Sequence, residues 1–315
     1  MLPIGRYRMN PLSLAGSVCA LATPFIDDDE AAIDFDAFAR LVIFQIEGGT
    51  RGLIAAGSTG EAAALDDAEF SALVRACVDT AAKRCLVGAG TGQSSTSRTI
   101  AMTRRAADAG VDFALVVTPP YVRATQDGLV RHYREVADHG GVPIMLYNVP
   151  GRTGCDLLPE TVKRLIDHEC IIGIKEAVPE AARMRDLLAL QTADFGVFSG
   201  DDPTFADAVL RGARGVVSVS ANVAPNAIQH LYKAAVTQSS ETQSLGAQLQ
   251  SLHRAMGLQS NPIPVKWALS HLGIGSPHLR LPLLPLEKPY HGEVESVLAS
   301  LPTLAPPTRE IQLER

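Results

Sequence analysis

Apolar and polar residues alternate in blocks along this chain. Short runs rich in valine, isoleucine, leucine and alanine are separated by longer segments whose apolar residues recur with the period of an α-helix, a pattern typical of βαβ units. We predict eight strands, at residues 18–25, 52–57, 85–90, 113–119, 143–149, 171–177, 195–200 and 215–220. Because each intervening segment is long enough for the crossover that parallel strands require, the strands are expected to be parallel.

The intervening segments predict helices at residues 34–47, 67–84, 97–109, 126–139, 159–167, 180–191, 203–210 and 225–238. Eight repeats of strand and helix fit a closed (β/α)8 barrel, the TIM barrel, better than an open doubly wound sheet. The predicted fold class is therefore α/β, a (β/α)8 TIM barrel with a small C-terminal helical appendage.

After the eighth predicted strand only helix-like segments follow, interrupted by prolines at residues 261–264 and 282–289. This region is too small to be an independent enzyme. We predict four parts: an N-terminal extension at residues 1–14, the catalytic barrel at 15–238, a C-terminal helical region at 239–301 and a flexible tail at 302–315.

The composition is that of a globular protein with a large core, since 46% of its 315 residues are hydrophobic and 20% are charged. A formal net charge of −6, without a lysine and arginine cluster, argues against nucleic-acid binding. No apolar run approaches the length of a membrane span. The sequence therefore predicts neither a nucleic-acid partner nor a membrane partner.

Cysteine usage and the N-terminus both favour a cytoplasmic location. The five cysteines form no C-x-x-C pair, so we expect buried free thiols in a reducing compartment. Residues 12–22 loosely imitate the apolar part of a signal peptide, but Ser13, Gly16 and Ser17 interrupt the run. Cleavage there would also remove the first predicted strand, so we expect no export.

In barrels of this type the chemistry lies at the C-terminal ends of the strands. Lys175 stands near the end of the run at 171–177, and Tyr147 ends the preceding apolar run. Consecutive parallel strands would project both side chains into one pocket. Burial favours the neutral amine, which can attack a carbonyl group. From the lysine alone, two interpretations stay open: Lys175 is a catalytic amine, or it is a lysine at a strand end whose ammonium group reaches solvent.

Other strand ends supply groups that suit a carboxylic acid substrate. Ser58 and Thr59 offer hydroxyl and backbone N–H groups to a carboxylate, although the same residues could simply cap a helix. Arg152 could hold a second carboxylate with two hydrogen bonds, or be an exposed loop charge. Tyr147 could shuttle protons or belong to the core.

Metal and nucleotide cofactors are not predicted. The strand ends lack two or three convergent His, Asp or Glu ligands, and none of the eight histidines forms an H-x-H or H-E-x-x-H pair. A glycine-rich stretch at 88–92 is similar to a dinucleotide loop, but the acids that follow it, Asp108 and Asp112, precede the next strand rather than end it. We therefore expect no metal and no organic cofactor.

Four motifs carry a resemblance to a known family. They are Gly-Ser-Thr-Gly-Glu at 57–61, Tyr-Asn-Val-Pro-Gly-Arg-Thr-Gly at 147–154, Ile-Gly-Ile-Lys-Glu-Ala at 172–177 and Asn-Pro-Ile-Pro-Val-Lys-Trp-Ala at 261–268. From about residue 16 to 301 the chain resembles the pyruvate-dependent Schiff-base aldolases, a family that includes the dihydrodipicolinate synthases and the N-acetylneuraminate lyases. The arginine at position 152 makes this motif resemble that of the synthases, because the corresponding motif of the lyases lacks an arginine there.

The resemblance implies a reaction and a set of site residues. Pyruvate would form a Schiff base with Lys175, and the resulting enamine would attack aspartate-4-semialdehyde to give 4-hydroxy-tetrahydrodipicolinate in lysine (diaminopimelate) biosynthesis. Thr59, Tyr147 and Tyr121 would form a proton relay, with Tyr121 supplied by a neighbouring subunit of a homotetramer built as a dimer of dimers. The residues implied to bind substrate are Ser58, Thr59, Arg152, Gly200 and Val217.

Alternatives and departures remain. A related aldolase or lyase could act on a sugar acid or hydroxy-keto acid, and a catalytically silent, ligand-sensing barrel is a third interpretation. Ser58 stands where the synthases often have threonine. The positions that form a lysine-feedback site in some relatives carry different side chains here, namely Asp67, Phe70, Arg98 and Pro120. We therefore expect weak or absent inhibition by lysine.

Overall fold

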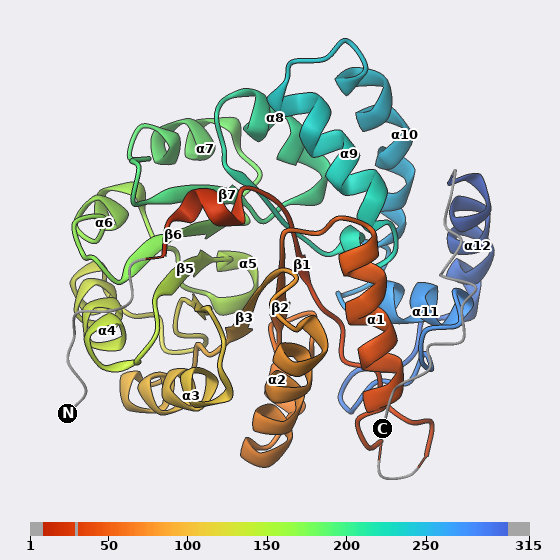
Figure 1. The fold of residues 1–315 in the computed structure, drawn as a ribbon, viewed down its shortest axis with the longest axis horizontal. Helices are drawn as coiled ribbons and strands as arrows, with labels where there is room; N and C mark the ends of the chain where they lie inside the picture. The colour runs from red at the N-terminus through yellow and green to blue at the C-terminus, as the bar shows by residue number, and fades with distance from the viewer. Residues whose placement is uncertain (1–8, 29–30, 302–315) are drawn as a thin grey trace.

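A closed barrel of eight parallel strands forms the centre of the computed structural model, which describes residues 9–28 and 31–301 (Figure 1). The strands pair in chain order, and β1 closes the barrel by pairing with β8. Their bounds are β1 (Gly16–Ala20), β2 (Gly52–Ala55), β3 (Leu86–Gly90), β4 (Phe113–Val117), β5 (Ile144–Asn148), β6 (Ile171–Glu176), β7 (Gly196–Ser199) and β8 (Gly215–Ser218). The predicted TIM barrel is confirmed.

Helices form a ring around the strands in Figure 1. The ring consists of α1 (Phe35–Glu47), α2 (Asp67–Ala81), α3 (Thr96–Ala109), α4 (Gln126–His139), α6 (Pro159–Lys163), α7 (Ala181–Leu188), α8 (Phe205–Leu210) and α9 (Pro225–Val236). A one-turn helix, α5 (Pro150–Thr153), follows β5. The described part of the chain also contains five 3₁₀ helices, which are η1 (Pro11–Leu14), η2 (Ala62–Ala64), η3 (Asp202–Thr204), η4 (Ser220–Asn222) and η5 (Lys288–Tyr290).

The C-terminal region adds α10 (Thr242–Ala255), α11 (Ile263–His271) and α12 (His291–Ser300). These helices, in blue in Figure 1, lie at one side of the ring, where α10 packs on α9 and α12. Trp267 of α11 is buried and stacks on His271, with ring centroids 4.3 Å apart, and it also lies 4.7 Å from the ring of His291. Residues 302–315, the predicted tail, and residues 1–8 of the predicted extension lie outside the described residues.

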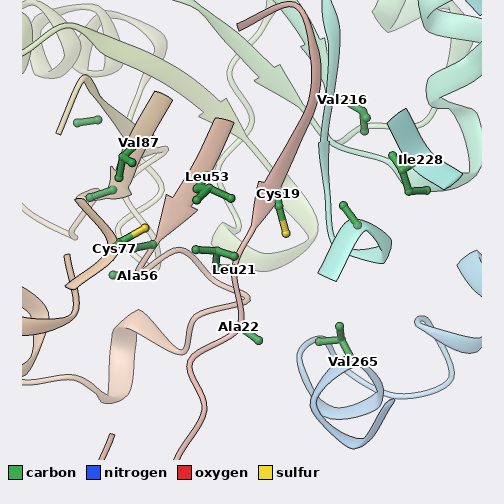
Figure 2. Close-up of a cluster of buried hydrophobic side chains, with 14 of the residues drawn as sticks. Cys19, Leu21, Ala22, Leu53, Ala56, Cys77, Val87, Val216, Ile228 and Val265 are labelled. Carbon is green, nitrogen blue, oxygen red and sulfur yellow. The ribbon is translucent and has the colours of Figure 1, made fainter. Parts of the chain in front are cut away.

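The first predicted strand, at 18–25, is wrong in its bounds. β1 ends at Ala20, and the chain then leaves the sheet while staying buried, with Leu21 and Ala22 at 1% and 0% exposure. These residues are apolar because they pack between the strands and the surrounding elements, which a hydrophobic run alone does not distinguish from a strand. Figure 2 shows part of this cluster, with Leu21 and Ala22 drawn together with strand residues such as Leu53. Likewise, the helix predicted at 159–167 already ends at Lys163.

Two separate apolar clusters form the core, as expected when successive side chains of a barrel strand face opposite sides. The larger lies between the strands and the helices. The smaller fills the barrel interior and contains Leu14, Val18, Ala20, Ile54, Phe113, Leu115, Met145, Tyr147, Ile172, Phe198 and Val217. Leu14 reaches this interior from η1, which precedes the first strand.

Among the helices of the described residues, none combines the length and the apolar character needed to cross a membrane.

Candidate active site

A shift in strand register turns Lys175 toward the barrel interior. Ile144 pairs with Ile171, but the next residue of β5, Met145, pairs with Gly173, so that β6 contains one extra residue. Such an insertion reverses which side chains face each side of the sheet beyond it. Ile172 faces the barrel interior, so strict alternation along β6 would turn Lys175, three residues later, outward. Because of the shift, Lys175 instead pairs with Tyr147, whose side chain faces inward.

Lys175 and Tyr147 are in contact at the C-terminal end of the barrel. The Nζ atom of Lys175 lies 4.3 Å from the centroid of the Tyr147 ring, and the two residues are 4% and 7% exposed. Gly200 follows β7 beside the lysine, because a Cβ atom on this glycine would lie 2.8 Å from Cε of Lys175. Val217 of β8 is buried in the barrel interior. The structure therefore places two predicted site residues, Tyr147 and Gly200, directly beside the lysine side chain.

A buried polar network lies behind this pair, on the outward side of the same two strands. Nδ2 of Asn148 donates to both carboxylate oxygens of Glu176, at 3.1 and 3.0 Å, and to Oδ1 of Asp156 at 2.8 Å. Arg183 forms ion pairs with Asp156 at 2.6 Å and with Glu176 at 3.3 Å. Burial raises the pKa of Glu176 to about 7, although the bonds from Val178 and Asn148 oppose the rise. The network ties β5 to β6 next to Tyr147 and Lys175.

The loop after β2 presents Thr59 and Ser58. Thr59 is 3% exposed, whereas Ser58 is exposed to solvent. Neither side chain caps a helix: the following α2 is capped by Asp66, whose carboxylate accepts from the backbone N–H groups of Ala68 and Glu69. The interpretation of these hydroxyls as plain helix caps is therefore wrong.

Asn261, which lies between α10 and α11, connects two of the predicted site residues. Its Nδ2 donates to Oγ1 of Thr59 at 2.9 Å, and its backbone carbonyl oxygen accepts from a guanidinium nitrogen of Arg152 at 3.1 Å. Arg152 lies on α5 with an exposed side chain. The C-terminal region thus reaches over the barrel end and contacts loops that follow β2 and β5.

A buried ion pair strengthens the same connection. Nζ of Lys266 on α11 lies 2.6 Å from Oε1 of Glu61, and both side chains are 1% exposed. The backbone N–H of Arg280 donates to Oε2 of Glu61 at 3.1 Å, and Lys266 lies over the ring of Phe25 at 4.1 Å. Burial lowers the pKa of Lys266 to about 8, and the Glu61 carboxylate limits the fall. Lys266 and Arg280 therefore anchor the loop that carries Thr59 through Glu61, two residues after the threonine.

The side chain of Tyr121 projects outward from the surface of the chain. Its side chain is 92% exposed, and its φ of 75° is in the left-handed region that aromatic side chains rarely adopt. Its backbone N–H donates to the carbonyl oxygen of Thr153 at 3.0 Å. Val122 beside it is 49% exposed, so two large apolar side chains face outward together.

A protein-family model, the dihydrodipicolinate synthetase family, matches residues 13–301, which is nearly the whole chain. The chain belongs to this family. The 4-hydroxy-tetrahydrodipicolinate synthase of Stenotrophomonas maltophilia (strain K279a) is 50% identical over 294 residues, 93% of this chain and 98% of that protein. The synthase of Xanthomonas axonopodis pv. citri (strain 306) is 52% identical over 289 residues, 91% of this chain and 95% of that protein.

A solved structure of the dihydrodipicolinate synthetase family gives the same result for the fold. The chloride-inhibited dihydrodipicolinate synthase from Acinetobacter baumannii, complexed with pyruvate, has a TM-score of 0.88 and 38% identity to this chain. The comparison covers 91% of this chain and 98% of that one. The predicted relationship to the Schiff-base aldolases is therefore confirmed.

Asn261, Glu61 and Lys266 were not predicted to be site residues, although all three lie in motifs that resemble the family. One local signal was present, since a lysine within an apolar helix is an unusual choice, whereas asparagine before proline is an ordinary turn signal. The contacts themselves join residues 202 and 205 positions apart, which no local pattern reveals.

Proposed function

We propose that this protein condenses pyruvate with aspartate-4-semialdehyde to give 4-hydroxy-tetrahydrodipicolinate, the reaction for which its curated relatives are named. The observation that carries the proposal is the buried Lys175, which faces inward against Tyr147 at the end of the barrel where such enzymes place their chemistry. The pyruvate complex of the Acinetobacter synthase supports the choice of first substrate.

In the proposed reaction, Nζ of Lys175 attacks the keto carbon of pyruvate and water leaves, which forms an imine. The imine accepts the electron pair when the methyl group loses a proton, so that an enamine forms without a metal or an organic cofactor. The enamine carbon then bonds to the aldehyde carbon of the second substrate. Attack of that substrate's amino group on the imine carbon closes the ring and releases Lys175.

We assign the proton transfers of these steps to the hydroxyl groups of Tyr147 and Thr59. Tyr147 contacts the amine, so it is placed to protonate the oxygen that leaves as water and to take up the proton released later. The hydroxyl and backbone groups of Ser58 and Thr59 would hold the pyruvate carboxylate, with Gly200 and Val217 lining the site. These roles are proposals that rest on placement and residue type.

Arg152 is the proposed binding group for the carboxylate of the semialdehyde. A guanidinium can form two parallel hydrogen bonds with a carboxylate, and that of Arg152 is exposed and held by the carbonyl of Asn261. Arg152→Ala should therefore raise KM for the semialdehyde while leaving imine formation intact. Efficient use of a sugar-acid aldehyde by the unmodified protein, in place of the semialdehyde, would contradict this choice of acceptor.

Borohydride reduction in the presence of pyruvate tests the imine. We expect one pyruvate-derived group per chain, located on Lys175 by peptide mass spectrometry, and none in Lys175→Ala. Lys233→Ala, which removes an exposed lysine of α9, is the matched control and should be labelled like the unmodified protein. An unlabelled Lys175 in an otherwise folded protein would refute the proposal.

We further propose a cytoplasmic homotetramer in which Tyr121 completes the proton relay of a neighbouring subunit. Its exposure, its left-handed backbone and the exposed Val122 support this role, since such conformations persist where function requires them. Mixing Tyr121→Phe chains with Lys175→Ala chains provides a test. If Tyr121 acts across the interface, hybrids regain activity that neither variant has alone; hybrids without activity would show that it does not.

A further inference from the structure

Asn261 lies between two proposed substrate-binding residues, Thr59 and Arg152, and its side-chain amide is only partly hydrogen-bonded. Its Oδ1 is buried and has no hydrogen-bond partner among the described residues. A buried acceptor without a partner costs about 1–3 kcal/mol, so it needs an explanation other than stability. The other end of the same amide, Nδ2, is used, and its partner is Oγ1 of Thr59 at 2.9 Å.

This contact determines how the Thr59 hydroxyl can act. A threonine hydroxyl has one proton to donate and two lone pairs with which it accepts. Because the Asn261 amide nitrogen can only donate, it occupies a lone pair of Thr59 and leaves the hydroxyl proton free for another acceptor. An unbonded threonine would instead rotate among several orientations.

The same residue holds Arg152 by a different group. The backbone carbonyl of Asn261 accepts from Arg152, so this contact does not depend on the Asn261 side chain. Substitutions of the side chain can therefore separate an effect on Thr59 from an effect on Arg152.

We propose that Asn261 is a positioning residue that orients the Thr59 hydroxyl as a proton donor toward the pyruvate-derived intermediate, while its backbone carbonyl orients Arg152 toward the second substrate. This inference rests on the proposed condensation. It assigns to the C-terminal helical region a direct part in arranging the site, through one residue that contacts both substrate-binding loops.

Two variants of Asn261 distinguish orientation from mere support of the structure. Asn261→Asp keeps the shape of the side chain, but an ionised carboxylate accepts the Thr59 proton and so directs it away from the substrate. Asn261→Ala removes the contact and leaves the hydroxyl free to rotate. We expect kcat to fall about tenfold in Asn261→Ala and about a hundredfold in Asn261→Asp, within the range of one proton-transfer group. KM for the semialdehyde should change less than about threefold in both, since the backbone bond to Arg152 remains.

The pH dependence provides a readout that a structural role would not change. A protonated aspartic acid can donate to Thr59 as the amide does, so the ratio of Asn261→Asp activity to unmodified activity should rise as the pH falls. The reverse ranking, with the alanine variant slower than the aspartate variant at every pH, is expected of a structural role and would overturn the inference.

A Thr59→Val background shows whether the effect passes through Thr59, and it applies even if Asn261→Asp fails to fold. In this background Asn261→Ala should cause no further loss of kcat; an equal loss in both backgrounds would overturn the inference. Failure of the inference is distinguishable from failure of the proposed function. The first leaves pyruvate labelling of Lys175 and condensation by the unmodified protein intact, whereas the second abolishes one or both.

Discussion

Replacing Lys266 with methionine tests how the C-terminal region is attached to the barrel. Methionine keeps most of the volume but removes the ammonium group 2.6 Å from Glu61, in a place where both side chains are 1% exposed. The carboxylate would keep only the backbone N–H of Arg280, at 3.1 Å. Removing one partner of a buried ion pair costs about 3–5 kcal/mol, because the remaining charge is left without compensation. With an unfolding entropy of about 2.1 cal/mol/K per residue over 315 residues, the expected fall in Tm is about 5–8 °C.

Differential scanning calorimetry at about pH 6 measures this effect, because Lys266, with its pKa of about 8, carries its charge in the unmodified protein at that pH. The double variant Glu61→Gln/Lys266→Met, which buries no charge, should recover much of the loss. Lys163→Met, at an exposed position on α6, is the matched control. A Tm of Lys266→Met equal to that of the control, or a double variant less stable than the single one, would refute the reasoning.

Three further predictions concern titration, crowding at the amine and regulation. Burial raises the pKa of Glu176 to about 7, above its value in the unfolded chain, so the native state binds more protons between about pH 4.5 and 7 and loses up to about 3 kcal/mol of stability as the pH rises through that window. Urea unfolding of Glu176→Gln should lack this loss, and a difference from the unmodified protein that does not vary with pH would contradict the assignment. Gly200→Ala should slow imine formation in borohydride trapping without lowering Tm, because its Cβ would lie 2.8 Å from Cε of Lys175; labelling at the unmodified rate would show that the lysine is free to move. Asp67 is paired with both Arg98 and Arg105, which leaves an excess positive charge that disfavours an ammonium ligand, so steady-state assays should show weak or no inhibition by lysine; inhibition at sub-millimolar lysine would prove this wrong.

Local periodicity was sufficient to predict the barrel, because each strand and each helix leaves its own pattern in a short window of sequence. It failed where the environment of a run is set by distant residues. Leu21, Ala22 and Phe25 are as apolar as strand residues, yet they lie beyond the end of β1 and belong to the larger core cluster. The register shift at Gly173 left no separate signal, although it decides that Lys175 faces inward.

Some contacts between the site residues could be predicted from the sequence, and others could not. Lys175 and Tyr147 are in contact, as expected of neighbouring parallel strands with matching ends. The link from Asn261 to Thr59 and Arg152 could not be predicted, because it depends on how a helical region docks on the barrel 202 residues from its partner in the sequence.

The contacts of Asn261 and Lys266 have a consequence for the order in which the site is completed during synthesis. A ribosome that has released residues up to 238 from its exit tunnel has supplied all eight strands, but neither of the groups that hold Thr59 and Glu61. Barrel closure through the pairing of β1 with β8 can therefore precede the completion of the catalytic loop. Loss of the last quarter of the chain would therefore leave the site incomplete and uncover part of the larger apolar cluster, while the cluster inside the barrel, which has no residue beyond Val217, would keep all its members.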